Sequence, residues 1–196
     1  TPRLETLVLA QNLLSDIASN VFEGLENVLS NLNLGYNKFN IIRSYYFQNL
    51  YSLKTLHLSS NKISSIQFNS FVNLENLERL FLDDNCLVNL DWRIFSKLTK
   101  LIVINLGKNI LIKLKSLWFR ETPNLKELYL NDNYISFLTS EYFEYLANLE
   151  LLNLSNNKIK SIDLNCFQNF KNLKSLNLND NNKEIKFYNF GRIRLE

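Results

Sequence analysis

The sequence predicts a solenoid of the α/β type, in which short units stack side by side and contribute about eight parallel strands to one face. Two observations predict it. The pattern L-x-x-L-x-L-x-x-N occurs eight times in 196 residues, with a single isoleucine among its leucines. The step between successive asparagines is 25 residues once and 24 residues six times. A fixed period of about 20 to 29 residues is typical of stacked repeats. The units are numbered one to eight by these residues: Asn12, Asn37, Asn61, Asn85, Asn109, Asn133, Asn157 and Asn181.

Each unit begins with a short strand. In unit four, Leu80 and Leu82 alternate with Arg79, Phe81 and Asp83. Alternation with a period of two places the two sets on opposite faces of a strand. Every strand is followed by a connection of similar length, which returns the chain beside its predecessor. The strands therefore run in one direction and form a parallel sheet.

The asparagine that ends each pattern is predicted to be structural. It lies where the chain turns from the strand into the connection, and a buried side-chain amide has to be hydrogen-bonded. We expect the stacked amides to bond backbone groups of their own and of neighbouring units, which would form a ladder along the solenoid.

The connections supply the rest of the core. A phenylalanine follows the asparagine by ten residues in units one to seven, so the rings are expected to stack in a column. In unit five, Thr122 and Pro123 interrupt the last apolar position, which predicts a rigid loop that lacks one core side chain. The column consists of Phe22, Phe47, Phe71, Phe95, Phe119, Phe143 and Phe167.

Two units depart from the period. The 25-residue step places one extra residue near Val28, where we expect a small bulge in the loop. In unit eight, Lys183 takes an apolar position, while Ile185 and Phe190 stand one residue early. The eighth loop is therefore expected to be frayed or different from the others.

Composition limits the classes of partner. The net charge of +3 is small and dispersed, whereas nucleic-acid binding is typical of a clustered basic face, so we expect no nucleic-acid partner. No apolar run approaches the roughly 18 residues of a membrane span, so no direct membrane contact is expected. Because one period runs through the chain, we expect residues 1–196 to form a single repeat array without terminal caps, a segment of a longer protein.

The two cysteines are not expected to form a disulfide. Cys86 and Cys166 lie three units apart and at different positions of the unit. Strands about 4.8 Å apart would separate them by about 15 Å, while a disulfide requires Cα atoms within about 7 Å. Two free thiols favour a reducing compartment.

The pattern L-x-x-L-x-L-x-x-N-x-L-x-x-L, with phenylalanine ten residues after the asparagine, resembles the 24-residue typical subtype of the leucine-rich repeat. The resemblance runs from Leu4 to about Phe190. It implies a right-handed horseshoe with the parallel sheet on its concave side and mostly irregular or 3-10 segments on its convex side. This subtype is common in ectodomains of animal Toll-like receptors and of chaoptin-like and slit-like proteins. An extracellular or cell-surface location follows from the resemblance, and the free thiols leave a cytoplasmic one as the alternative.

The specific information lies in side chains that point outward from the sheet. Units four to six combine apolar side chains with charges, a mixture that is typical of protein interfaces. We expect a protein ligand or partner receptor to bind there, although Phe81 and Tyr129 could also be ordinary strand residues that pack on their neighbours. A sequon at Asn153 is a candidate glycosylation site. The candidate ligand-binding residues are Arg79, Phe81, Asp83, Asp84, Val103, Asn105, Glu127, Tyr129, Asn131 and Asp132, with Lys108 beside them.

Chemistry other than binding is not expected. Aspartates of alternate units are about 10 Å apart, too far to share a calcium ion whose ligands lie at about 2.3 to 2.6 Å. Only the adjacent pair Asp83 and Asp84 could contribute to a calcium site. The single histidine, His57, has no carboxylate in its own unit to orient it as a base. We therefore expect no enzyme, no metal and no cofactor.

The sequence thus predicts a recognition segment of a cell-surface or secreted receptor or adhesion protein, with the ligand on the concave sheet. Two alternatives remain open. One is an intracellular leucine-rich repeat scaffold, and the other is a structural spacer that binds no ligand of its own.

Overall fold

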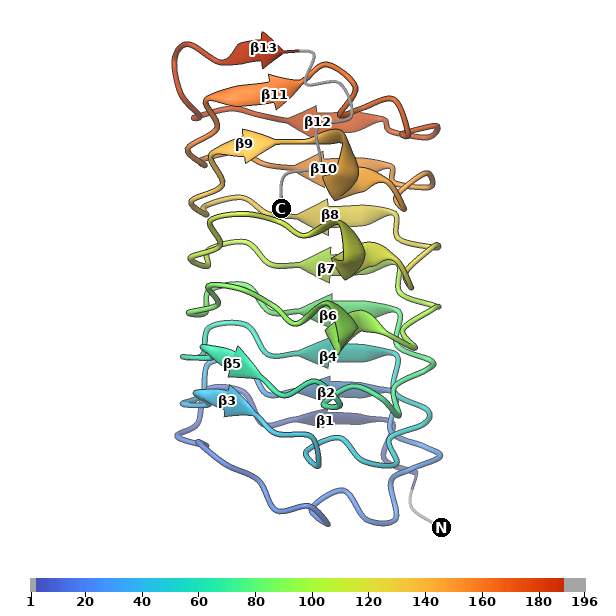
Figure 1. Cartoon of the computed structure of the whole chain (residues 1–196). Helices are drawn as coiled ribbons and strands as arrows, with labels where there is room; N and C mark the ends of the chain where they lie inside the picture. Colours follow the sequence, from blue (N-terminus) through green and yellow to red (C-terminus); the bar gives the residue numbers. More distant parts are fainter. Residues whose placement is uncertain (1–2, 189–196) are drawn as a thin grey trace.

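The chain is a stack of eight turns, each of which crosses two faces of the molecule (Figure 1). The computed structural model describes residues 3–188. Phe190, which stands one residue early in unit eight, lies outside the described residues. Among residues 3–188, no helix combines the length and apolar character required to cross a membrane.

One face is a parallel sheet with one strand from each unit, as predicted. The pattern leucines pair in register along it, for example Leu56 with Leu80 and Leu80 with Ile104, and point into the core. The strand order is β1 (Thr6–Val8), β2 (Asn31–Asn33), β4 (Thr55–His57), β6 (Arg79–Phe81), β7 (Val103–Asn105), β8 (Glu127–Tyr129), β10 (Leu151–Asn153) and β12 (Ser175–Asn177).

The opposite face carries short strands and single-turn 3-10 helices, again as predicted. The described residues contain no α-helix. One small sheet joins β3 (Ile41–Ile42) to β5 (Ser65–Ile66), and another has the order β13 (Lys186–Tyr188), β11 (Ser161–Asp163), β9 (Phe137–Leu138). The 3-10 helices are η1 (Trp92–Phe95), η2 (Ser116–Phe119) and η3 (Ser140–Phe143).

The asparagine ladder is confirmed. In unit six, the buried Asn133 donates from Nδ2 to the carbonyls of Leu106 and Leu130 at 3.0 and 3.1 Å. Its Oδ1 accepts the N–H of Leu111 at 2.9 Å. The same set recurs from Asn37 to Asn181. Each asparagine therefore bonds its own strand end and the loop of the unit before it.

The phenylalanine column is confirmed in part. Phe47 stacks on Phe71 and Phe95 on Phe119, with ring centroids 6.0 and 6.2 Å apart. Phe167 is only partly buried, and its ring stacks on Phe170 instead.

One expectation about unit five is wrong. Thr122 was expected to leave the core short of one side chain. It is fully buried instead, and its hydroxyl donates to the carbonyl of Phe119 at 3.0 Å. Because this hydrogen bond satisfies the hydroxyl, threonine can occupy an apolar position.

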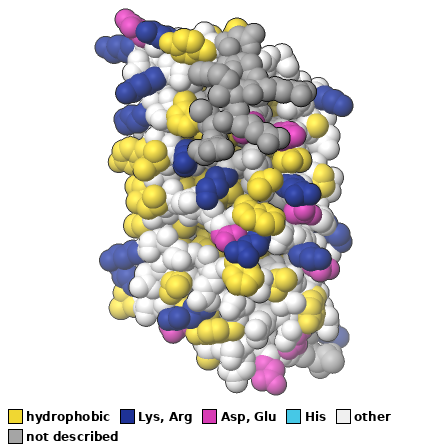
Figure 2. All heavy atoms as spheres, viewed as in Figure 1, with side chains coloured by type: hydrophobic (Ala, Val, Ile, Leu, Met, Phe, Trp, Pro, Cys, Tyr) yellow, Lys and Arg dark blue, Asp and Glu magenta, His cyan; other side chains and the backbone are white. Residues whose placement is uncertain are grey.

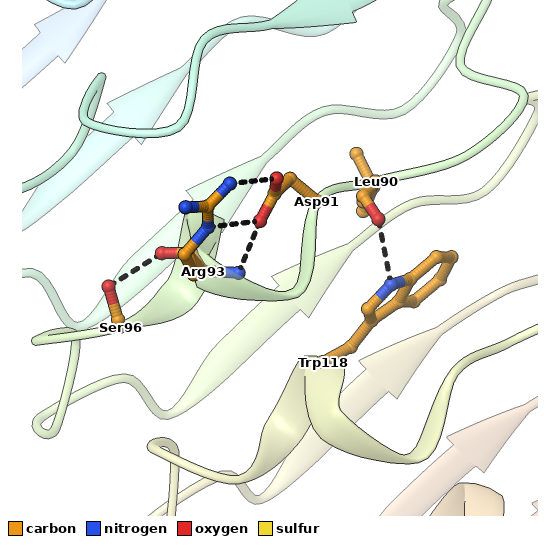
Figure 3. A network of polar contacts seen from close by, with 5 residues as sticks. All are labelled: Leu90, Asp91, Arg93, Ser96 and Trp118. Atoms are coloured by element: carbon orange, nitrogen blue, oxygen red, sulfur yellow. Dashed lines mark hydrogen bonds and ion pairs between the residues drawn. The ribbon is translucent and has the colours of Figure 1, made fainter.

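The 3-10 turns are held by polar contacts (Figure 3). Asp91 caps η1 and accepts the backbone N–H of Arg93 at 2.9 Å, while the Arg93 guanidinium reaches the same carboxylate at 2.9 and 2.7 Å. Trp118 of η2 is buried, and its Nε1 donates to the carbonyl of Leu90 in the preceding unit at 3.0 Å. The first contacts thus hold η1 itself, and the bond from Trp118 ties η2 to the preceding unit.

The two irregular units have different outcomes. The extra residue between units one and two is absorbed in a wider turn, as expected, where the carbonyl of Leu25 accepts from both Val28 and Leu29 at 3.2 and 3.0 Å. The loop of unit eight was expected to be frayed or different, but β13 pairs with β11 and continues the small sheet of units six and seven. It differs from them in that Phe187 and Tyr188 are exposed. The two cysteines are both free, with Cys86 exposed and Cys166 buried.

Candidate binding surface on the concave sheet

The predicted contact residues of units four to six form four parallel rows. Strand register places Arg79, Val103 and Glu127 in the first row. The second row, two residues along each strand, holds Phe81, Asn105 and Tyr129. Beyond the strand ends lie Asp83 and Asn131, and then Asp84, Lys108 and Asp132. The sheet thus brings the predicted residues together on one continuous surface, which we call the concave surface.

Val103 was expected to be an exposed apolar contact, and this expectation is wrong. Its exposed fraction is 6%. The register sets it between Arg79 and Glu127, and these longer side chains shield a short branched one. Val103 is therefore covered by its neighbours and is not available for contact with a ligand, while Phe81 and Tyr129 remain partly exposed.

Phe81 has a partner that sequence reasoning missed. The rings of His57 and Phe81 are paired across β4 and β6, with centroids 4.3 Å apart and planes 3° apart. Their positions in adjacent units, 24 residues apart, were the available signal. Burial lowers the pKa of His57 below its ordinary value of 6.5, and the carboxylate of Asp83 opposes this shift. The pair is therefore a flat, uncharged aromatic surface at neutral pH.

The carboxylates of the concave surface are engaged by neighbouring polar side chains. Glu127 accepts the hydroxyl of Tyr129 at 2.9 Å. Burial, followed by this hydrogen bond, raises the pKa of Tyr129, so the phenol keeps its proton. The carboxylates of Asp83 and Asp84 accept from the hydroxyls of Ser59 and Ser60, both at 2.7 Å.

No metal cage results from these contacts. Asp83 and Asp84 each bond to a different serine rather than converging on one point. Within residues 3–188, no group of three or more His, Cys, Asp or Glu side chains is arranged to hold an ion. Asp132 likewise bonds to neighbouring amides, those of Asn131 and Asn156.

The concave surface is acidic on balance. It has four carboxylates and two cations, so its formal charge is two negative units. None of these six groups forms an ion pair with another described residue. The carboxylates are therefore available to pair with positive charges on a partner. The four acidic residues are Asp83, Asp84, Glu127 and Asp132, and the two basic residues are Arg79 and Lys108.

The fourth row of the concave surface belongs to a column of residues in the left-handed conformation. The residue before each asparagine has φ between 51° and 59° in all eight units, although none is glycine. Asp and Asn tolerate this conformation better than most side chains, and their frequency there was a signal that sequence reasoning missed. The column comprises Gln11, Tyr36, Ser60, Asp84, Lys108, Asp132, Asn156 and Asp180.

The sequon residue Asn153 lies in β10, inside the second row. Its Oδ1 accepts from the N–H and the hydroxyl of Ser155 at 3.1 and 2.8 Å, and its Nδ2 donates to Asn131 at 3.4 Å. A glycan on Nδ2 would replace the contact with Asn131 and cover the edge of the concave surface.

The histidine provides a direct test of this geometry. We expect the NMR titration of His57, the only histidine of the chain, to show a pKa below 6.5, because burial disfavours the charged ring. Phe81→Ala should raise that pKa by exposing the ring, and Asp83→Asn should lower it further by removing the negative charge. Because the unfolded chain binds this proton more readily, stability should fall as the pH drops through about 6.5. A pKa that neither variant moves would contradict the assignment.

Comparison with known families supports the repeat assignment. The model of the leucine rich repeat matches residues 27–87, 75–135 and 123–182. No curated protein shows significant sequence similarity to the chain.

Three solved structures are similar over most of the chain. The TLR13-ssRNA13 complex matches with 34% identity and a TM-score of 0.83, over 90% of this chain and 25% of that one. The Toll–Spatzle complex of Drosophila matches with 24% identity and a TM-score of 0.77, over 90% and 27%. Human 5T4, a trophoblast glycoprotein, matches with 21% identity and a TM-score of 0.75, over 92% and 73%.

These matches qualify one expectation. The chain spans about a quarter of the TLR13 and Toll chains, so the activities of those whole proteins are not assigned to this segment. One match is a complex with RNA. The expectation that dispersed charge excludes nucleic acid is therefore not supported.

Proposed function

Because the chain belongs to the leucine-rich repeat family, we propose that it is a protein-recognition segment that binds a partner with a basic, partly apolar face on the concave surface. We further propose that residues 1–196 form one repeat array of a receptor or adhesion protein at the cell surface or outside the cell. Similarity to the Toll–Spatzle structure and, at 34% identity, to the TLR13 structure supports the receptor role.

One observation carries the binding proposal. Partly exposed rings, His57 paired with Phe81 and then Tyr129, lie beside four carboxylates on a rigid sheet. Aromatic side chains supply much of the energy at protein interfaces, and complementary charge supplies orientation and rate. Because the sheet strands and the asparagine ladder hold the rows in place, little ordering is needed on binding. Nothing in this arrangement requires a chemical step.

Single-stranded RNA is a second candidate, favoured by one observation. The paired rings of His57 and Phe81 offer a flat face on which a base could stack, and the TLR13 match is an RNA complex. The acidic balance of the concave surface opposes this candidate, because phosphate contacts dominate nucleic-acid affinity.

The protein-recognition proposal can be tested with one double variant. We expect Phe81→Ser combined with Tyr129→Ser to weaken binding of a fluorescent arginine-rich amphipathic peptide by about tenfold or more, as loss of aromatic hot spots does. Asn177→Ser, in the same row of unit eight, is the matched control and should bind like the parent. Fluorescence anisotropy measures both, and circular dichroism confirms that each variant is folded.

Glu127→Gln should also weaken binding of the arginine-rich peptide, because it removes one negative charge from the concave surface. The same variant should strengthen binding of a single-stranded RNA if RNA is the ligand. Unchanged affinity for the peptide in the double variant would rule out the protein-recognition proposal.

A further inference from the structure

A second exposed surface lies on the flank of the stack, where the chain leaves the sheet. Two columns face outward there, one and three residues after each asparagine. In units two, three and seven these columns carry Lys38 and Asn40, Lys62 and Ser64, and Lys158 and Lys160. In units four to six, five of the six positions are apolar instead, with Ser136 the exception. We call these five the flank patch: Cys86, Val88, Ile110, Ile112 and Tyr134.

The flank patch is continuous and open to solvent. Backbone hydrogen bonds from Cys86 to Ile63, from Ile110 to Leu87 and from Tyr134 to Leu111, at 2.8 to 3.0 Å, fix successive units side by side. All five side chains are exposed, and the four large ones have exposed fractions between 39% and 55%. Figure 2 shows hydrophobic side chains together on its left edge, where the strands of the large sheet end, with basic side chains above and below them.

The fold does not require apolar residues at these positions. Lys62 donates its backbone N–H to Phe39, and Lys158 to Ile135, both at 2.9 Å. This is the same bond that Cys86, Ile110 and Tyr134 make. Lysine therefore satisfies the backbone geometry equally well. A cluster of exposed apolar side chains that packing does not explain is typical of an interaction site.

The charges around the flank patch define its partner. The flank segments of units two to seven, residues 38–41, 62–65, 86–89, 110–113, 134–137 and 158–161, contain no Asp or Glu. None of their lysines forms an ion pair with another residue that the structure describes. These lysines are Lys38, Lys62, Lys113, Lys158 and Lys160. An apolar centre with lysines at both ends is complementary to an apolar segment with carboxylates at both ends.

A second copy of this chain does not fit that description. In a two-fold dimer, the same patch meets itself. Lysines at the ends of one flank patch would then face those of the other, and like charges at an interface are unfavourable.

We propose that the flank patch is a second binding site, which takes a protein segment with an apolar centre and acidic ends. Its residues are distinct from those of the concave surface, and the two surfaces adjoin where Asp84 and Asp132 precede Cys86 and Tyr134 by two residues.

The test uses a fluorescent peptide with a Leu-Trp-Leu-Phe centre and glutamates on both sides. Ile110→Lys combined with Ile112→Asn copies the residues of unit two onto unit five, so the fold should be retained. We expect this double variant to weaken binding of the peptide about tenfold, because it removes the apolar centre of the flank patch. Lys62→Glu combined with Lys158→Glu should have a similar effect through charge. Glu127→Gln on the concave surface should leave the affinity unchanged.

Two comparison probes can overturn the proposal. A peptide with lysines in place of the glutamates should bind at least about tenfold more weakly, and equal binding of the two peptides would contradict the charge argument. Vesicles of phosphatidylcholine and phosphatidylserine test the alternative of a membrane surface. Vesicle binding that is lost in the Ile110/Ile112 variant, without binding of the acidic peptide, would replace the proposal with that alternative.

Cys86 supplies an internal probe of the same site. It is exposed at the edge of the flank patch, while Cys166 is buried, so a maleimide should label Cys86 first, and Cys86→Ser should abolish that reaction. Saturating acidic peptide is expected to slow the labelling about fivefold or more by covering the thiol. An unchanged labelling rate would show that the peptide binds elsewhere and would overturn the assignment.

Discussion

Replacing Asn133 with alanine is expected to lower the free energy of unfolding by about 3 kcal/mol, because it leaves a buried N–H without an acceptor and removes several hydrogen bonds at once. The orphaned donor is the backbone N–H of Leu111, which Oδ1 of Asn133 accepts at 2.9 Å. The carbonyls of Leu106 and Leu130 keep a second donor, Nδ2 of Asn109 and of Asn157 respectively. Urea unfolding followed by circular dichroism measures the change.

Two further variants sharpen this prediction. Asn124→Ala is the matched control, since Asn124 is exposed and donates a single hydrogen bond to Thr99, and it should cost less than about 1 kcal/mol. Asn133→Asp keeps an acceptor for Leu111 but places a carboxylate against backbone carbonyls. It should be more destabilising than alanine at pH 7.

The aspartate variant should also respond to pH in a defined direction. Burial against carbonyls raises the pKa of the folded carboxyl above about 3.9. Protonation therefore favours the folded state, and stability should recover relative to the parent as the pH falls toward 4 and be lost as it rises. An aspartate variant as stable as the parent at pH 7 would contradict the structural role of the amide.

Replacing Trp118 with alanine is expected to cost about 3 to 5 kcal/mol, the usual range for removal of a large buried aromatic side chain. Trp118 is only 1% exposed, and its indole N–H satisfies the carbonyl of Leu90. The variant thus creates a cavity and also leaves a buried acceptor without its donor.

The second tryptophan is a matched control in the preceding unit. Trp92 is 42% exposed, and Trp92→Ala should cost about 1 kcal/mol because less apolar area is lost. Chemical unfolding followed by circular dichroism compares the two variants without relying on the fluorescence that each one loses. Equal effects would show that the convex turns do not contribute to the core as the structure describes.

The periodic part of the fold could be predicted from the sequence because each unit repeats the same physical requirements. Leu80 and Leu82 must face the core, Asn85 must satisfy a strand end, and Phe95 must fill the convex side. These demands produce the same residue every 24 positions. The strands and the ladder are therefore predicted, and the structure confirms them, while the phenylalanine column is confirmed in part.

The concave surface was predicted less completely, because its details depend on neighbours across the sheet. Sequence pattern alone shows that Val103 points outward, but its burial depends on the lengths of Arg79 and Glu127 on either side. The pairing of His57 with Phe81 likewise depends on strand register, and the pattern treats both as free surface residues. The burial of Thr122 was missed because its hydroxyl finds a carbonyl acceptor one turn back.

The direction of the asparagine ladder bears on how the protein forms during synthesis. Each asparagine closes the loop of the unit that precedes it, as Asn133 does for Leu111 and Asn157 for Ile135. The ribosome releases the N-terminal units first, so the newest loop has no acceptor until the next strand emerges. Folding should therefore lag behind synthesis by one repeat. The loop of the most recently synthesised unit should stay without its hydrogen-bond acceptor until the asparagine of the next unit has left the ribosome.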